Sequence, residues 1–219
     1  MAQPQGATIP LTQQQLDAAN QMWSGLPGWQ TYDAALGLAA ETYPSNTDPT
    51  AVLIKAALLD RLYATNVYEL PAAVDRIVEV FSRKPALSGY EVVVALSEVQ
   101  GRHLVSFASK YAHFFYEKHL PLTDSYAIYT LTRHFRVPKA RIEVWTRDYP
   151  VYCLKLAELK RASQLAATAR ETDHYLWLAG NWITFQQQGP DATINKELKR
   201  YFTDPEHEKR LADAFGALL

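Results

Sequence analysis

The sequence predicts an all-α protein, and three observations indicate this fold class. Hydrophobic residues recur at intervals of three and four along most of the 219 residues, as on one face of a helix, rather than alternating as in strands. Residues that cap helices precede several of these periodic segments. Prolines, which remove a helical hydrogen-bond donor, stand at the predicted breaks: Pro85, Pro121, Pro138, Pro150, Pro190 and Pro205. No sheet is needed to explain the pattern.

The helices can be placed in order along the chain. The first lies in "LTQQQLDAANQMW", where Thr12 is a cap, and the second in "TDPTAVLIKAALLDRLYATN", which starts at Thr and Asp caps and ends at Asn66. Further helices are predicted at about 70–84, 89–98, 102–118, 124–135, 139–147, 151–170, 172–187, 194–202 and 204–217. The turn in "FQQQGPDATIN" separates the longer helices from a C-terminal helical cap.

The size of the chain allows one globular unit, 1–219, because 48% hydrophobic and 12% aromatic residues can bury a substantial core. A division into helical subdomains at 1–100 and 172–219, packed around a core at 101–171, is the alternative. The longest apolar run, "AVLIKAALL", is interrupted by Lys55 and is too short to span a bilayer. The N-terminus lacks the features of a secretory signal and Cys153 is the single cysteine, so we expect a cytoplasmic protein.

The net charge of −1 conceals an uneven distribution of charge. Residues 1–100 carry a net charge of −5, whereas residues 102–170 carry +7. If the basic residues of 102–170 share a face, DNA could bind there. The competing interpretation is that they are scattered over solvated helix faces. The DNA-binding candidates are Gly101, Arg102, Arg133, Arg136 and Lys139.

The segment 102–118 combines an aromatic stripe with a polar stripe. The apolar stripe consists of Leu104, Phe107, Ala108, Tyr111, Phe114 and Phe115. The polar stripe consists of His103, Ser106, Lys110, His113 and Glu117. A polar stripe on a helix usually faces water, but beside an aromatic stripe it can also line a cleft. Asp124 begins the next predicted helix, where a carboxylate can cap free backbone N–H groups.

The run "EVQGRHLVSFASKYAHFF" followed by "LPLTDSYAIYTL" resembles the core of the helix-hairpin-helix DNA glycosylase superfamily, and more particularly the bacterial 8-oxoguanine DNA glycosylase-like proteins. The resemblance covers about residues 97–135 and implies a multi-helix orthogonal bundle. Gly101 would be the remaining glycine of the hairpin, and Asp124 would be the family's essential aspartate. Lys110 lies nine residues after Gly101, so it matches the family's lysine only if the hairpin is remodelled.

The resemblance implies base excision without a cofactor. Cleaving an N-glycosidic bond builds positive charge on the sugar, which the Asp124 carboxylate would stabilise. The Lys110 amine would attack the sugar carbon and form a Schiff base, adding AP-lyase activity. The extruded base needs an aromatic pocket, and the substrate-binding candidates are His103, Ser106, His113, Tyr126 and Trp182.

Other chemistries have weaker support in the sequence. The six histidines include no His-Glu-x-x-His pair and no Cys/His cluster with zinc-like spacing, so no metal is expected. A glycine-rich phosphate loop and a serine nucleophile elbow are missing too. The second hypothesis is therefore a non-catalytic helical module that binds nucleic acid or a protein partner on a glycosylase-like scaffold.

Overall fold

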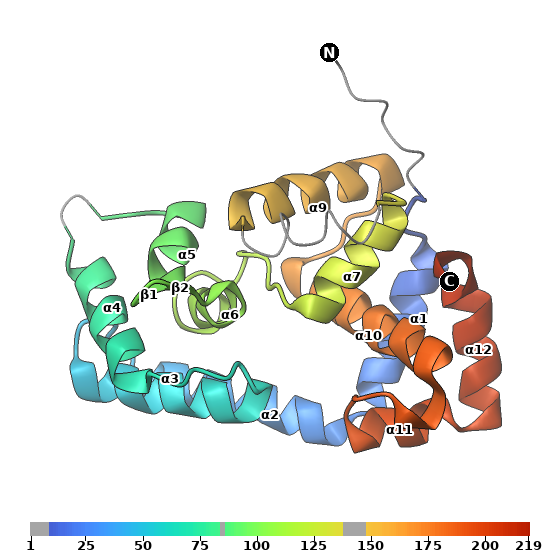
Figure 1. Ribbon diagram of the computed structural model, residues 1–219, viewed down its shortest axis with the longest axis horizontal. Helices are drawn as coiled ribbons and strands as arrows, with labels where there is room; N and C mark the ends of the chain where they lie inside the picture. Colours follow the sequence, from blue (N-terminus) through green and yellow to red (C-terminus); the bar gives the residue numbers. More distant parts are fainter. Residues whose placement is uncertain (1–8, 84–85, 138–147) are drawn as a thin grey trace, which may run out of the picture. The chain divides into compact units, whose positions relative to one another are not determined.

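The computed structural model of the chain describes residues 9–83, 86–137 and 148–219 (Figure 1). The described residues are mainly helical, and the strands among them form one two-stranded pair, so the predicted all-α class is confirmed. The chain forms two compact units. Among the described residues, unit 1 comprises 9–27, 124–137 and 151–219, and unit 2 comprises 28–83, 86–123 and 148–150.

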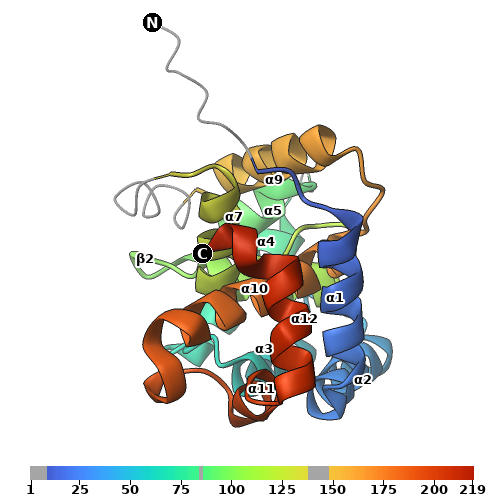
Figure 2. The same ribbon diagram turned by 90° about the vertical axis from the view of Figure 1, so that its right-hand side faces the viewer.

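Unit 1 is built around its longest helix, α10 (Ala169–Gln188). Helices α7 (Ser125–His134), α1 (Gln13–Ser24) and α12 (Pro205–Phe215) pack against α10, as Figures 1 and 2 show. The remaining elements of this unit are α9 (Tyr149–Ser163), α11 (Lys196–Phe202) and the 3-10 turns η2 (Gly189–Asp191) and η3 (Gly216–Leu218), with the first two residues of α9 falling in unit 2.

The crossing of α7 and α10 in unit 1 depends on a glycine. A Cβ added to Gly180 of α10 would clash with the Tyr126 carbonyl oxygen and lie 2.9 Å from Thr130 Oγ1, both on α7. Thr130 Oγ1 also donates a hydrogen bond of 2.7 Å to the Leu176 carbonyl of α10. The backbones of α7 and α10 can therefore approach each other only because position 180 carries no side chain.

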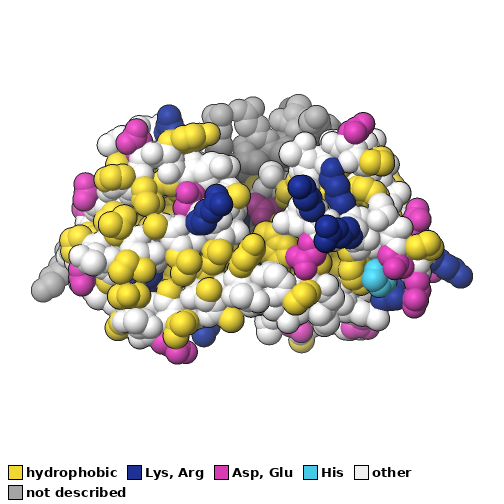
Figure 3. All heavy atoms as spheres, turned by 90° about the horizontal axis from the view of Figure 1, so that it is seen from below, with side chains coloured by type: hydrophobic (Ala, Val, Ile, Leu, Met, Phe, Trp, Pro, Cys, Tyr) yellow, Lys and Arg dark blue, Asp and Glu magenta, His cyan; other side chains and the backbone are white. Residues whose placement is uncertain are grey.

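Unit 2 contains α2 (Pro27–Thr42), whose first residue falls in unit 1, together with α3 (Pro49–Tyr63), α4 (Leu70–Ser82), α5 (Tyr90–Ser97) and α6 (Val105–Phe115). Helix α3 packs against α4 and α6, and α5 packs against α4 and α6. On the face seen in Figure 3, hydrophobic side chains gather over α2 and α3, where Leu38 and Leu53 are exposed. No described helix is long and apolar enough to cross a membrane.

Most predicted helices are confirmed, with three corrections. Thr12 caps α1 in a capping box with Gln15, and Asp48 caps α3. Helix α2 was not predicted, and the helix expected at 151–170 ends at Ser163 instead. The segment expected to begin a helix at 102 is instead half of a hairpin, so the expectation that no sheet forms is wrong at this point. The helix predicted at 139–147 lies outside the described residues.

Candidate functional site

A short β-hairpin joins α5 to α6 in unit 2. Strands β1 (Glu98–Val99) and β2 (Arg102–His103) are antiparallel, with Glu98 opposite His103. The two turn residues, Gln100 and Gly101, have φ of 47° and 76°, as in the type I′ turn that suits two-residue hairpins. The Leu104 N–H donates to the Ser97 carbonyl at 2.8 Å and closes the base of the hairpin. Two packed helices are thus connected by a hairpin with a glycine at its tip.

The tip of this hairpin is accessible. Gly101, Arg102 and His103 are all exposed. The Arg102 guanidinium lies 5.5 Å from the centre of the exposed Tyr68 ring, which leaves the charge close to solvent. An exposed cation beside turn N–H groups is suited to a phosphate oxygen.

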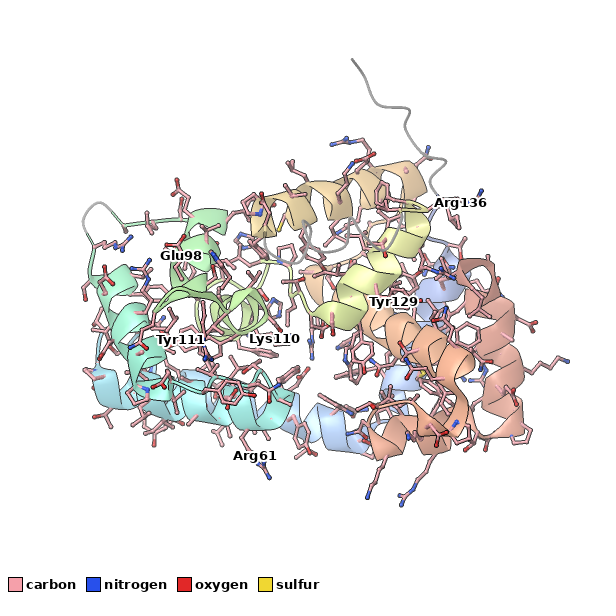
Figure 4. The ribbon with its side chains drawn as sticks, viewed as in Figure 1. Arg61, Glu98, Lys110, Tyr111, Tyr129 and Arg136 are labelled. Carbon is pink, nitrogen blue, oxygen red and sulfur yellow. The ribbon has the colours of Figure 1, made fainter. Side chains whose placement is uncertain are left out.

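Lys110 of α6 is buried rather than solvated, with 4% of its surface exposed. Its Nζ donates to Ser106 Oγ at 2.8 Å and to the Thr123 carbonyl at 3.1 Å. Ser109 Oγ accepts a hydrogen bond of 3.1 Å from the Thr123 N–H. These bonds hold the segment before α7 against α6, and Figure 4 labels Lys110 on that helix.

The polar stripe is exposed only in part. His103 is exposed, Ser106 is half-buried, and His113 is buried. His113 Nδ1 carries a proton and donates it to the Leu120 carbonyl at 2.9 Å, because a carbonyl can only accept. Glu117 Oε2 lies 3.1 Å from His119 Nε2. The middle of the stripe therefore anchors the segment 120–123 instead of facing water.

Asp124 follows Thr123 directly and caps α7. Its backbone is extended, and its Oδ1 accepts the Ala127 N–H at 2.9 Å. The predicted capping role of Asp124 is confirmed. The carbonyl that accepts from Lys110 belongs to the peptide bond between Thr123 and Asp124, so the capping residue and the acceptor of the amine are consecutive in the chain.

The aromatic substrate-binding candidates in unit 1 have different surroundings. Tyr126 is half-buried and its hydroxyl donates to the Thr193 carbonyl at 2.9 Å. Burial, together with the nearby Asp124 charge, raises the pKa of Tyr126. Trp182 is 1% exposed and its ring meets that of Phe215 edge-on at 5.8 Å. Tyr126 is thus close to the surface, whereas Trp182 belongs to the core.

The basic candidates of unit 1 lie at the end of α7. Arg133 is half-buried, and its Nε donates to the Leu218 carbonyl at 2.6 Å. Arg136 is exposed, in a left-handed backbone conformation with φ of 50°. Lys139 lies outside the described residues. Arg136 is consequently the more accessible of the two described cations.

A buried lysine in unit 2 was not among the sequence candidates. Lys55 of α3 is 1% exposed, and its Nζ donates to the Ser45 carbonyl at 2.8 Å and to Asn46 Oδ1 at 2.6 Å. Asn46 Oδ1 also accepts from the Tyr111 hydroxyl at 2.9 Å. Burial lowers the pKa of Lys55 to about 8. The signal in the sequence was the position of Lys55 inside the most apolar run of the chain.

A buried histidine–tyrosine pair in unit 1 was missed as well. His134 Nδ1 donates to the Ile9 carbonyl at 2.6 Å, and its Nε2 accepts from the Tyr175 hydroxyl at 2.5 Å. Burial lowers the pKa of His134 to about 4, and it raises the pKa of Tyr175. Both groups are therefore neutral at pH 7, and they tie the segment at Ile9 to α7 and α10.

Metal chemistry has no centre in the part of the chain that the structure describes. Within residues 9–83, 86–137 and 148–219, no three His, Cys, Asp or Glu side chains come together as a metal site would require.

The fold and these side chains define an all-α protein with a hairpin between two packed helices, a buried lysine on the second helix and an aspartate capping the next one. A family model described as an N-terminal domain, HI_0787_N, matches residues 13–119, just under half of the chain. The match spans α1 to α6 and therefore includes the hairpin and Lys110, but not Asp124. No curated protein and no solved structure matches the chain.

Proposed function

We propose that the chain is a DNA glycosylase-like enzyme that excises a damaged base by cleaving its N-glycosidic bond. The observation that carries this proposal is the order of three structural features along the chain. A glycine-tipped hairpin joins two packed helices, a buried lysine follows on the second helix, and an aspartate caps the next helix. Helix-hairpin-helix glycosylases, including the bacterial 8-oxoguanine glycosylase-like proteins, use the same order, and the proposal includes their orthogonal bundle as the fold.

In this proposal Asp124 supplies the negative charge. As the bond between the sugar C1′ and the base nitrogen breaks, its electron pair leaves with the base, which takes up a proton, and positive charge develops on the sugar. The Asp124 carboxylate stabilises that charge, since a fixed carboxylate in a site shielded from water acts far more strongly than one in solvent. With water as the nucleophile, the reaction ends at an abasic site.

Lys110 supplies the alternative nucleophile. After losing one proton, its Nζ attacks C1′ and displaces the base, which leaves with the electron pair of the N-glycosidic bond. The C1′–O4′ bond then breaks as O4′ takes up the proton released from the nitrogen, which opens the sugar ring and leaves an imine that permits strand cleavage. Ser106 Oγ and the Thr123 carbonyl, which accept from Nζ, would hold the amine in position until the substrate displaces them. His103, Ser106, His113 and Tyr126 are the proposed contacts to the nucleotide.

The hairpin supplies contacts to the DNA backbone. The exposed turn at Gly101 and the Arg102 guanidinium would meet one phosphate, and the exposed Arg136 would meet another. Each such contact releases a counterion, so the affinity for DNA should fall steeply with salt.

The test is cleavage of duplexes that carry a single oxidised, deaminated or alkylated base. We expect excision of at least one lesion and a loss of about 100-fold or more in the Asp124→Asn variant, because the developing charge is no longer compensated. Lys118→Ala, which removes an exposed lysine beyond the end of α6, is the matched control for Lys110→Ala. Excision that is absent on every lesion, or unchanged in Asp124→Asn, would overturn the proposal.

A second candidate is a helical module that binds nucleic acid or protein without turnover. It is favoured by the structural bonds that both key groups already make: Lys110 holds the segment before α7, and Asp124 caps α7. Borohydride trapping separates the two candidates, because it reduces an imine to a stable adduct. A DNA-linked adduct that is lost in Lys110→Ala and kept in Lys118→Ala excludes the module. DNA binding that Arg102→Ala weakens, without excision of any lesion, supports it.

A further inference from the structure

A concave site lies within unit 1, between the last turns of α7 and α10. The cavity measures about 350 Å³, at the small end of the range for sites that hold organic ligands. Its polar lining consists of Tyr129, Thr132 and Arg133 from α7 and Thr184, Gln187 and Gln188 from α10. Tyr129 is labelled on α7, beside α10, in Figure 4. None of the proposed catalytic groups lines this cavity.

Two donors in the cavity are fixed in place by the fold. Arg133 donates through Nε to the Leu218 carbonyl at 2.6 Å and through Nη2 to the main-chain oxygen of Leu219, which holds the guanidinium 5.8 Å from the centre of the Tyr129 ring. The Tyr129 hydroxyl donates to Gln187 Oε1 at 2.9 Å. The Nε2 group of Gln187 is thereby left as a donor of two hydrogen bonds.

The cavity offers acceptors as well as donors. Thr132 Oγ1 donates to the Tyr129 carbonyl at 2.7 Å, and Thr184 Oγ1 donates to the Gly180 carbonyl at 2.8 Å. Each hydroxyl has spent its proton inside the helix and presents its lone pairs to a ligand. Each of the two helices thus contributes one donor and one acceptor to the lining: Arg133 and Thr132 from α7, and Gln187 and Thr184 from α10.

The charge of the cavity argues against an anionic ligand. Among the described residues of the lining, Arg133 alone carries a charge, and two main-chain oxygens already accept from it. The last turns of both helices also bring the negative ends of their dipoles to this place. A neutral ligand with donors and acceptors along one edge fits this environment better than a phosphate does.

We propose that this cavity binds a purine base or its nucleoside. Glutamine and arginine are the side chains that pair with purine edges, the former with adenine and the latter with guanine, and a tyrosine ring offers a stacking surface for the base. A neutral purine edge carries both donors and acceptors, and the lining offers both as well, through Gln187, Arg133 and the two threonines. This site is distinct from the proposed excision chemistry and goes beyond it.

The experiment is calorimetric titration of the full chain with adenosine, guanosine, uridine and inorganic phosphate, without DNA. We expect one of the purine nucleosides to bind more tightly than uridine and phosphate. Gln187→Ala should weaken that binding about tenfold, the value of a hydrogen bond or two. Gln186→Ala is the matched control, because Gln186 is exposed, next to Gln187 in the chain and outside the lining. The affinity of this variant for the purine nucleoside should stay within about twofold of that of the wild type.

A further variant protects the test against misfolding. Tyr129→Phe keeps the ring but frees the Gln187 amide, so it should weaken purine binding less than Gln187→Ala while leaving the thermal unfolding temperature near that of the wild type. The proposal is overturned if neither purine nucleoside binds, if phosphate binds as tightly, or if Gln186→Ala and Gln187→Ala lose the same affinity. Because no DNA is present, none of these results depends on whether the chain excises a base.

Discussion

The buried His134 should make the protein lose stability in mild acid. Its pKa is about 4 in the folded chain, against 6.5 for an ordinary histidine. A folded-state pKa below the unfolded value means that the unfolded chain binds the proton more readily. The stabilisation is therefore complete above pH 6.5 and is lost as the pH falls from 6.5 towards 4.

The magnitude follows from the two pKa values. Between about pH 7.5 and pH 5, the free energy of unfolding should fall by about 2 kcal/mol through this group alone. Protonation of Nε2 would also set a proton against the Tyr175 hydroxyl, which now donates to that nitrogen. The loss should appear in unit 1, which contains both residues.

Urea unfolding at the two pH values, followed by tryptophan fluorescence, measures this loss. In His134→Gln the difference between the two pH values should shrink by about 2 kcal/mol, although the variant is less stable at both. His119→Gln, which removes an exposed histidine, should keep the wild-type difference. If wild type and His134→Gln show the same dependence on pH, the reasoning about this imidazole is refuted.

Two further predictions concern packing and a buried polar cluster. Gly180→Ala should destabilise unit 1 by about 2 to 4 kcal/mol in urea unfolding, since the added Cβ meets the backbone of α7, whereas Gly37→Ala in the open part of α2 should stabilise by about 0.5 to 1 kcal/mol. Equal effects of the two changes would contradict this account. Asn46→Ala should cost about 2 to 4 kcal/mol, because it strips an acceptor from the buried Lys55 amine and the Tyr111 hydroxyl. The cost should be smaller in a Lys55→Met background, and an equal cost in both backgrounds would show that the amine does not depend on Asn46.

The sequence predicted elements whose signals are local. Thr12 caps α1 and Asp124 caps α7 because a cap depends on bonds to residues two or three positions away. Helix α2 was not predicted because it begins at Pro27 and contains Gly37, and proline and glycine usually mark breaks. The hairpin escaped it because strands of two residues carry no periodicity, and Gln100 is an unusual residue for a left-handed turn position.

The surroundings of the candidate site could not be predicted in the same way. The helical spacing of Lys110 and His113 suggests a stripe that faces water. In the structure the segment that follows α6 folds back, and the carbonyls of Thr123 and Leu120 accept hydrogen bonds from these two side chains. Those acceptors are backbone carbonyls, which every residue carries, so the sequence does not indicate which of them will accept a hydrogen bond. The same holds for the Ile9 carbonyl at His134 and for the Ser45 carbonyl at Lys55.

The two-residue turn of the hairpin between α5 and α6 can be exchanged without changing the strands that carry it. Its two strands pair only with each other, and its turn residues, Gln100 and Gly101, are exposed. Replacing Gln100 by Asn would give the turn its preferred sequence and make the loop more rigid without touching either helix. Grafting a different two-residue turn would likewise alter what the tip touches while leaving Lys110 in its buried setting. The exposed turn and the buried surroundings of Lys110 are therefore parts that protein engineering, or natural drift, could change one at a time.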